Sequence, residues 1–322
     1  MGLSGWRRSA RLGRRCRNRA STRFDRTAQV EGSRVSEEVS GHGALQSYVD
    51  KWLAVQPQQR TALVFVDPAK YPGHVALAAW EQELLSAAYG IREPHVAATK
   101  LNWWAEELSG AASSGGRHPL TRVLFDDERA HAIPQEHWLA PVLAAMAQLE
   151  EGTAVDFSAQ LAATSALHGA LAALETAWWY GNTVSPARAT RVATLSHLLF
   201  ALRRLQDDAE RDRLPLPMAR LARFGLSRAS LRQPSEARDQ AIRAQLDDLR
   251  SAWSEASRLD GPLSVFRTLE AGDGERLMRK AARAGAPLKV LQTGTPNSGF
   301  LATLRAWRAA QRWQRQVAGQ HP

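Results

Sequence analysis

The sequence predicts an all-α protein, a bundle of packed helices. Its 322 residues are 44% hydrophobic, so the chain can bury a substantial core, as one large domain or as two small ones. Segments rich in Ala, Leu and Arg dominate, whereas alternating runs of β-branched residues, which are typical of strands, are scarce. The one strand we expect, Ala62–Val66, is short and ends at Asp67-Pro68. These patterns favour layers of helices packed on one another.

The helices of the first half follow from apolar spacing and from Pro and Gly breakers. Prolines separate the first helix from the second, and Gly90 and Pro94 separate the second from the third. After the third helix we expect a Ser/Gly loop at Gly110–Gly116 and a polar loop at Asp126–Glu136. The expected helices of this half are Leu45–Leu53, about His74 to Tyr89, roughly His95–Leu108, His137–Leu149 and Phe157–Tyr180.

Three helices and a linker are expected in the second half. Pro186 suits the first turn of a helix that runs to Asp208. A long amphipathic helix follows at Ser235–Arg258. A linker rich in Gly, Pro and Thr at Gly285–Ser298 then leads to a last helix at Gly299–Gln316.

The last expected helix is amphipathic and basic. Phe300, Leu304 and Trp307 form an apolar stripe that ends at Gln311. Its basic face consists of Arg305, Arg308, Arg312 and Arg315. Two interpretations stay open, namely peripheral contact with an anionic membrane surface, or packing of a terminal helix with snorkelling arginines. No apolar run approaches the roughly 18–20 residues that a membrane span needs.

Positive charge is concentrated in the first 40 residues. They hold ten Arg against four acidic residues, a balance of +6 out of the formal net charge of +10. The segment lacks the apolar stretch of a secretory signal. Three interpretations stay open: a disordered arm attracted to nucleic acid or membrane, a transit-like peptide, or sequence upstream of the true start. We therefore expect a disordered Arg-rich extension at 1–43, a helical domain at 44–284, and a linker with a basic helix at 285–322.

Several classes of function find no support in the sequence. Cys16 is the one cysteine, which excludes disulfides within the chain. The nine histidines show no metal-ligand spacing, and we expect His168 and His197 to be structural histidines in helices. The motifs of P-loop proteins, dinucleotide-binding proteins and serine hydrolases are absent from the sequence.

The densest chemical signal lies in Leu198–Gly225. An apolar helix face runs into interleaved carboxylates and arginines and stops at a Leu-Pro-Leu-Pro step. Asp208 and Asp212 stand four residues apart and share one helix face. Such carboxylates can hold Mg²⁺ together with substrate phosphates, and nearby guanidinium groups suit bidentate phosphate contacts. The segment is therefore a plausible place for a diphosphate.

This segment resembles the second aspartate motif of the squalene/phytoene synthase family. In that motif a helix with Asp-x-x-x-Asp runs into Ala-Arg-Arg-Gly-Arg, a Tyr-Leu-Pro stop and a short helix that ends in Gly. The matching positions here are Asp208-Ala209, Arg211, Arg213, Leu216-Pro217 and Phe224-Gly225.

A second match lies upstream. The segment Ala97–Leu108 with the trailing His118-Pro119-Leu120 is similar to the Trp-Trp-x-x-Glu-Leu and His-Pro-Leu pieces of many bacterial members. Ala76–Pro94 stands where the family carries its first aspartate motif. The resemblance covers roughly Gln46 to Arg283 and implies an isoprenoid-synthase-like helical bundle around a central cavity.

The chain departs from the family pattern in both acidic motifs. Ser86–Gly90 replaces the first Asp-x-x-x-Asp pair, and the nearest carboxylates are those of Glu81 and Glu83. Arg204 stands where the leading Asp of the second motif is expected, and Asp212 occupies the usual Gly position. Because bound Mg²⁺ stabilises the leaving diphosphate, the loss of these carboxylates predicts weak metal loading.

Three functions are compatible with these residues. The resemblance implies Mg²⁺-dependent head-to-head joining of prenyl diphosphates, with Glu83, Asp207, Asp208 and Asp212 as metal ligands. Diphosphate contacts would come from Arg203, Arg204, Arg211 and Arg213. The alternative is a non-catalytic member that binds a prenyl diphosphate or another lipophilic small molecule, or that acts as an assembly factor. Nucleic-acid binding through the Arg-rich extension is the least favoured. We expect a cytoplasmic protein with peripheral contact to the inner membrane face as an option.

Overall fold

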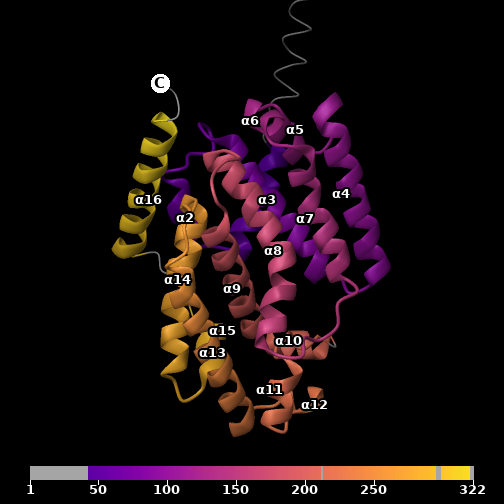
Figure 1. Cartoon of the computed structure of the whole chain (residues 1–322), viewed down its shortest axis with the longest axis vertical. Helices are drawn as coiled ribbons and strands as arrows, with labels where there is room; N and C mark the ends of the chain where they lie inside the picture. Colours follow the sequence, from indigo (N-terminus) through magenta and orange to yellow (C-terminus); the bar gives the residue numbers. More distant parts are fainter. Residues whose placement is uncertain (1–42, 212, 295–298, 320–322) are drawn as a thin grey trace, which may run out of the picture. The chain divides into compact units, whose positions relative to one another are not determined.

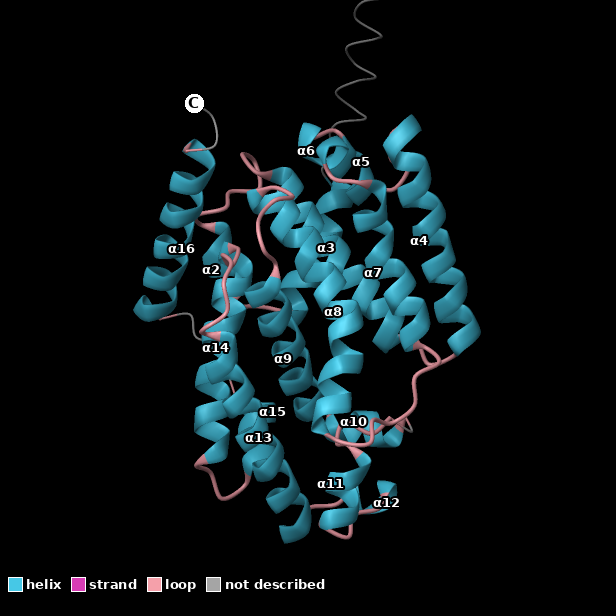
Figure 2. Cartoon of the chain, in the orientation of Figure 1, coloured by secondary structure: helices cyan, strands magenta, loops and turns pink. Residues whose placement is uncertain are grey.

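The computed structural model describes residues 43–211, 213–294 and 299–319, and within these ranges every regular element is a helix (Figures 1 and 2). The prediction of an all-α fold is confirmed. The described residues from Leu45 onwards belong to one compact unit. The predicted Arg-rich extension lies outside the described residues, apart from its last position. Within the described ranges no helix is long and apolar enough to cross a membrane.

The helices follow one another with short connections. Residues 43–55 are helical. The first half continues with α2 (Gln59–Leu63), α3 (Pro72–Leu85), the π-helical turn η1 (Ser86–Gly90), α4 (Pro94–Ser114), α5 (Pro119–Phe125), α6 (Glu128–Ala132), α7 (Gln135–Gln148) and α8 (Phe157–Tyr180). The second half consists of α9 (Ala187–Arg203), α10 (Leu205–Glu210), α11 (Met218–Arg223), α12 (Arg228–Leu231), α13 (Glu236–Ala256), α14 (Val265–Ala282), α15 (Pro287–Thr293) and α16 (Phe300–Ala318).

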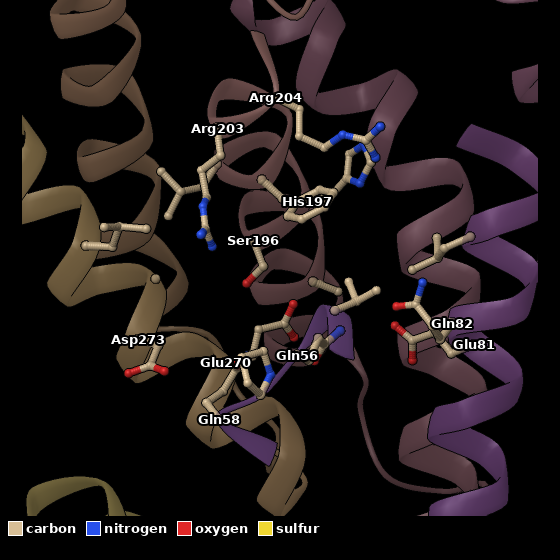
Figure 3. A pocket seen from close by; sticks show the side chains of 18 of the residues that line it. Gln56, Gln58, Glu81, Gln82, Ser196, His197, Arg203, Arg204, Glu270 and Asp273 are labelled. Atoms are coloured by element: carbon tan, nitrogen blue, oxygen red, sulfur yellow. The ribbon is translucent and has the colours of Figure 1, made fainter. Parts of the chain in front are cut away.

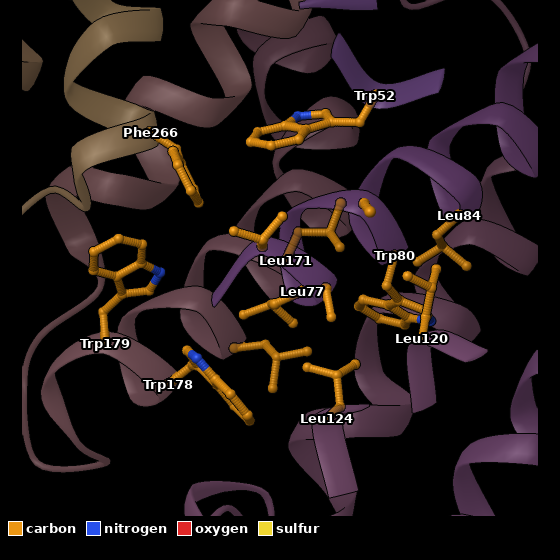
Figure 4. Close-up of a cluster of buried hydrophobic side chains, with 14 of the residues drawn as sticks. Trp52, Leu77, Trp80, Leu84, Leu120, Leu124, Leu171, Trp178, Trp179 and Phe266 are labelled. Atoms are coloured by element: carbon orange, nitrogen blue, oxygen red, sulfur yellow. The ribbon is translucent and has the colours of Figure 1, made fainter. Parts of the chain in front are cut away.

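Two apolar cores hold the helices together. The first is rich in tryptophan and joins α3, α4, α5, α7 and the end of α8 to the start of α14 and to α16 (Figure 4). The second is built mainly of leucine from α9, α13, the end of α14 and α15. Helices α8 and α9 pack on each other and link the two cores. The boundary between the cores is therefore lined by α3, α8, α9 and α14.

The predicted strand at Ala62–Val66 does not form. Its first residues belong to α2, and the segment continues as turns. Ala62 and Val66 are completely buried, whereas Val64 is 73% exposed. Buried positions four residues apart fit one side of a helical turn, and the alternation expected of a strand is absent.

Three segments expected as loops or linker contain helix. Helix α4 continues through the predicted Ser/Gly loop, where Ala111 packs in the first core and the Ser114 hydroxyl donates to the Gly110 carbonyl. Asp127 caps α6 inside the predicted polar loop by accepting from the Arg129 N–H. In the predicted linker Gly285–Ser298, α15 buries Leu288 and Leu291. In each case burial or capping outweighs the weak helix propensity of the local sequence.

Two further differences concern the helices around the acidic segment. The predicted helix Pro186–Asp208 is divided at Arg204, whose backbone (φ −96°, ψ 13°) is not α-helical, so the carboxylates of α10 leave the line of α9. The sequence pattern does not predict α14, because Gly272 and Gly274 weaken its helical spacing. Both glycines lie close to a neighbouring side chain. A Cβ at Gly274 would come within 2.8 Å of the Trp253 ring, and one at Gly272 within 2.7 Å of Arg305 Nη1.

Candidate functional site

A cavity of about 420 Å³ lies where the two cores meet (Figure 3). Its walls come from α3, α8, α9 and α14, and the segment 54–58 closes one side. Apolar lining is provided by Leu85 at the edge of the first core and by Leu199 and Leu277 of the second. The volume falls within the range of about 300–1,000 Å³ typical of small-molecule pockets.

Two arginines mark one end of the cavity. Arg203 and Arg204, at the end of α9, both line it (Figure 3). Burial lowers the pKa of Arg203, as expected for a cation that is partly withdrawn from water. Arg204 lies over the Phe200 ring at 5.7 Å from its centre. Neither guanidinium forms a hydrogen bond or salt bridge within the described ranges, so both have donors left for an anion. The charge of Arg204 also acts on Asp208, where it opposes the rise in pKa that burial causes.

Carboxylates line the opposite wall, and they surround a third arginine. Arg267 of α14 is 5% exposed and forms ion pairs with Glu81 of α3, Glu175 of α8 and Glu270 of its own helix. Burial raises the pKa of Glu81 to about 7 against the opposing effect of Arg267, with further raising by Glu175 and Glu270. Burial also raises the pKa of Glu270. Three carboxylates thus share one guanidinium.

An aromatic wall joins these two ends. The rings of His168 on α8 and His197 on α9 lie 4.2 Å apart, and Tyr89 of η1 packs on both. Burial lowers the pKa of His197 to about 4, and Arg204 adds to this. Burial likewise lowers the pKa of His168. Both imidazoles are therefore neutral at physiological pH and offer an uncharged surface to a ligand.

The comparisons agree with this architecture. A family model described as squalene/phytoene synthase matches residues 60–307. That is most of the chain. The protein belongs to the squalene/phytoene synthase family. No match is found among curated proteins.

Two solved structures share the fold. A squalene synthase, HpnC from Alicyclobacillus acidocaldarius, superposes with a TM-score of 0.61 at 16% identity, over 76% of this chain and 95% of that one. A dehydrosqualene synthase in complex with a ligand gives a TM-score of 0.57 at 11% identity, over 87% of this chain and 99% of that one. At these identities the likeness concerns the fold alone.

The Trp-Trp-x-x-Glu-Leu and His-Pro-Leu pieces of this family member form one structural unit. Trp104 is buried, whereas Trp103 is 39% exposed. The carboxylate of Glu107 accepts hydrogen bonds from the backbone N–H groups of Arg117 and His118, at 2.7 and 2.9 Å, and from the Thr121 hydroxyl. The motif pair therefore stabilises the turn between α4 and α5 and does not reach the cavity.

Three of the four predicted metal ligands, Glu83, Asp207 and Asp208, lie outside the cavity lining. Glu83 forms salt bridges with Lys51 and Lys100 at 3.6 and 3.2 Å and is absent from the cavity lining. Asp207 is exposed, and Asp208 is partly buried but also outside the lining. Asp212 lies outside the described residues. Their assignment as metal ligands stays a prediction.

The four predicted diphosphate ligands divide into two pairs. Arg203 and Arg204 line the cavity, as described above. Arg213 donates to the backbone carbonyls of Tyr89 and Ile91, which ties the acidic segment to the end of η1. Arg211 is exposed and lies outside the lining. Arg267, Glu175 and Glu270 were not predicted as site residues. Glu83 was predicted as a metal ligand, and Glu81, two positions before it, was not.

The cavity of this family member does not fit a Mg²⁺ cluster. Mg²⁺ takes oxygen ligands in near-octahedral geometry and needs carboxylates with free lone pairs on its side. Of the carboxylates that line the cavity, those of Glu81 and Glu270 already accept hydrogen bonds from Arg267, and that of Asp273 forms an ion pair with Arg276. Within the described ranges, no group of three or more His, Cys, Asp or Glu side chains has an arrangement that could hold a metal ion.

Proposed function

We propose that this protein binds one prenyl diphosphate in the cavity, with the diphosphate held by arginine. Arg203 and Arg204 are the cationic groups that line the cavity without a hydrogen bond or salt bridge among the described residues. Guanidinium groups bind phosphate oxygens through charge-assisted and often bidentate hydrogen bonds. The observation that carries the proposal is the position of these two side chains at one end of a largely apolar cavity.

The prenyl chain would extend from the arginines between α9 and α14. Leu199, Phe200 and Leu277 offer apolar contacts there, and the neutral imidazole of His197 adds an uncharged surface. Such contacts contribute in proportion to the apolar area that they remove from water, about 25 cal/mol per Å². A long hydrocarbon chain therefore adds affinity that inorganic pyrophosphate lacks.

A binding role is favoured over head-to-head joining for two reasons. The volume of about 420 Å³ lies at the small end of the range for ligand pockets, which suits one prenyl chain better than two. Metal-assisted departure of diphosphate also needs carboxylates that face the cavity with free oxygens. The lining carboxylates of Glu81 and Glu270 are engaged by Arg267, and that of Asp273 forms an ion pair with Arg276.

The test is calorimetric titration of farnesyl diphosphate into the purified full chain, in Mg²⁺ and again in EDTA. We expect one site per chain and similar affinity in both buffers. The double variant Arg203→Gln/Arg204→Gln should bind at least about tenfold more weakly, because two charge-assisted phosphate contacts are lost.

Arg211→Gln is the matched control, since Arg211 is exposed and lies outside the cavity lining. Its affinity should equal that of the wild type. Binding that requires Mg²⁺, or release of pyrophosphate from farnesyl diphosphate in Mg²⁺, would contradict the proposal and favour a synthase.

We also propose that α16 contacts an anionic membrane surface, from which a lipophilic ligand would come. Helix α16 packs inward through small residues and Trp313, whereas Phe300, Leu301 and Trp307 are 79%, 62% and 47% exposed. The apolar stripe predicted from the sequence thus points largely to solvent. Exposed apolar side chains beside arginines are typical of interfacial helices.

Co-sedimentation with vesicles tests this contact. The protein should sediment with vesicles of phosphatidylglycerol and less with vesicles of phosphatidylcholine, because exposed arginines attract anionic headgroups. Phe300→Ser/Trp307→Ser should reduce sedimentation severalfold. The control Leu143→Ser removes an apolar side chain that is 58% exposed on α7 and should have no effect. Equal sedimentation with both lipids would count against the proposal.

A further inference from the structure

The guanidinium of Arg267 lies at the centre of three carboxylates that come from three helices. Its Nη2 donates to both oxygens of Glu81 at 3.0 Å, its Nε donates to Glu175 at 3.0 Å, and its Nη1 donates to Glu270 at 2.7 Å. The guanidinium has five N–H donors in a planar fork, and these contacts use most of them. The side chain is therefore held from three directions.

The surrounding structure fixes this arrangement before any ligand binds. The Ser264 hydroxyl caps α14 by accepting from the Arg267 N–H at 2.9 Å, and it donates to Glu175 at 2.6 Å. The four ionic side chains are between 5% and 21% exposed. Because Arg267, Glu81 and Glu270 also line the cavity, the cluster forms part of its wall.

Three carboxylates on converging helices beside a ligand cavity attract a cation strongly, and here that cation is a side chain. A divalent ion that shared these oxygens would lie a few ångströms from the guanidinium, and the repulsion between the two positive charges is strong in a buried site. The oxygens could coordinate a metal only by giving up their hydrogen bonds to Arg267. Removal of the guanidinium would leave buried carboxylates without a counter-charge, a costly state unless another cation replaces it.

We propose that Arg267 is a built-in cation that occupies the place of a divalent ion among Glu81, Glu175 and Glu270. Its charge offsets one of the three negative charges without metal, and in its absence the three carboxylates can close around a divalent cation. This inference deepens the proposed function, because it explains why this wall takes no Mg²⁺ and leaves the diphosphate to Arg203 and Arg204. Its test needs no prenyl diphosphate, so the two can fail separately.

The experiment is a titration of the full-length variant Arg267→Gln with Mn²⁺, followed by electron paramagnetic resonance at about pH 8, which lies above the pKa of about 7 that burial gives Glu81. We expect one Mn²⁺ per chain, bound at least about tenfold more tightly than by the wild type, because three carboxylates become available. Added Mn²⁺ should also raise the melting temperature of Arg267→Gln and leave that of the wild type unchanged.

Arg276→Gln is the matched control, because Arg276 is on the same helix, lines the same cavity and pairs with Asp273 at 3.7 Å, away from the cluster. It should not gain Mn²⁺ binding. Wild-type protein that binds Mn²⁺ at this site, with loss of binding in Glu81→Gln, would overturn the proposal. So would a folded Arg267→Gln variant that binds no Mn²⁺.

A second variant covers the case in which Arg267→Gln does not fold. Arg267→Gln/Glu175→Gln removes one positive and one negative charge together, and it leaves the two carboxylates that line the cavity. It should bind Mn²⁺ more weakly than the single variant but more tightly than the wild type. Recovery of folded Arg267→Gln on addition of Mn²⁺ supports the proposal, whereas a folded double variant without Mn²⁺ binding refutes it.

Discussion

At the residue scale, Glu107 shows how one buried carboxylate stabilises a turn between two helices. Its side chain is 1% exposed and accepts from two backbone N–H groups, the Thr121 hydroxyl and the Arg117 guanidinium. Burial raises the pKa of Glu107, but the hydrogen bonds from Thr121, His118 and Arg117 outweigh it and lower the pKa to about 2. The folded state thus prefers the ionised form.

We expect Glu107→Gln to lower the free energy of unfolding by about 2–4 kcal/mol near neutral pH, because charge-assisted hydrogen bonds are lost. The pKa is lower in the folded state than its ordinary value of 4.5, so the advantage of the wild type is complete above 4.5. It declines as the pH falls towards 2. Urea unfolding of both proteins at several pH values measures the difference.

Glu106→Gln serves as the control for this comparison. Glu106 precedes Glu107 on α4 but is exposed. Exposed substitutions usually change stability by less than about 0.5 kcal/mol. A loss equal to that of Glu107→Gln would show that the turn contacts do not cause the effect.

At the element scale, the contact between α3 and α8 depends on a glycine. Gly73, in the first turn of α3, lies against the ring of Trp178 on α8, and a Cβ there would be 2.6 Å from Trp178 Cζ2. Trp178 is 2% exposed and is enclosed by other rings of the first core. The ring therefore has little room to move away. This contact positions the helix that carries Glu81.

Gly73→Ala should destabilise the protein by about 1–3 kcal/mol, because it overpacks a filled core. Gly110→Ala on α4 is the matched control, since its Cβ would meet only Ser114 Oγ at 4.0 Å. We expect Gly110→Ala to be neutral or to stabilise by up to about 1 kcal/mol through better helix propensity. Thermal unfolding measures both variants, and equal losses would contradict the close-contact argument.

At the scale of the whole molecule, three buried neutral histidines make stability depend on pH. His74 is enclosed by Tyr71, Trp179 and Trp313 without a hydrogen-bond partner among the described residues. Burial, with a contribution from Arg129, lowers its pKa to about 3. Burial also lowers the pKa values of His168 and His197. These groups are thus spread across the first core and the cavity wall.

The free energy of unfolding should fall as the pH decreases from 6.5. The unfolded chain binds protons on these histidines there, whereas the folded state does not, because its histidine pKa values are lower. Each histidine that is protonated only in the unfolded chain lowers the free energy of unfolding by up to about 1.4 kcal/mol per pH unit. Glu81 acts in the opposite sense, since its raised pKa gives stability below 4.5 that is lost as the pH rises through 7. The difference between the wild type and His74→Phe isolates one histidine.

His74→Phe should flatten the decline between pH 6.5 and pH 3, which urea unfolding at several pH values measures. The control His95→Phe replaces an exposed histidine at the start of α4 and should keep the wild-type profile. If His74→Phe keeps that profile too, His74 does not carry the pH dependence.

The sequence by itself determined the helical class and the family. Local signals sufficed for these features: apolar spacing in Phe157–Tyr180, which matches α8 in full, and motif spacing around the Leu-Pro step. Such signals depend on residues a few positions apart, and the hydrogen bonds of a helix act over the same range.

Only the tertiary structure decided which charges meet in the cavity. Glu81 and Glu83 stand two positions apart on α3, so they point to different sides of the helix, and packing against α8 and α14 selects Glu81 for the cavity. Arg267 meets Glu81 across 186 positions of the chain. No local pattern encodes that contact, because it depends on how α3 and α14 pack against the same core.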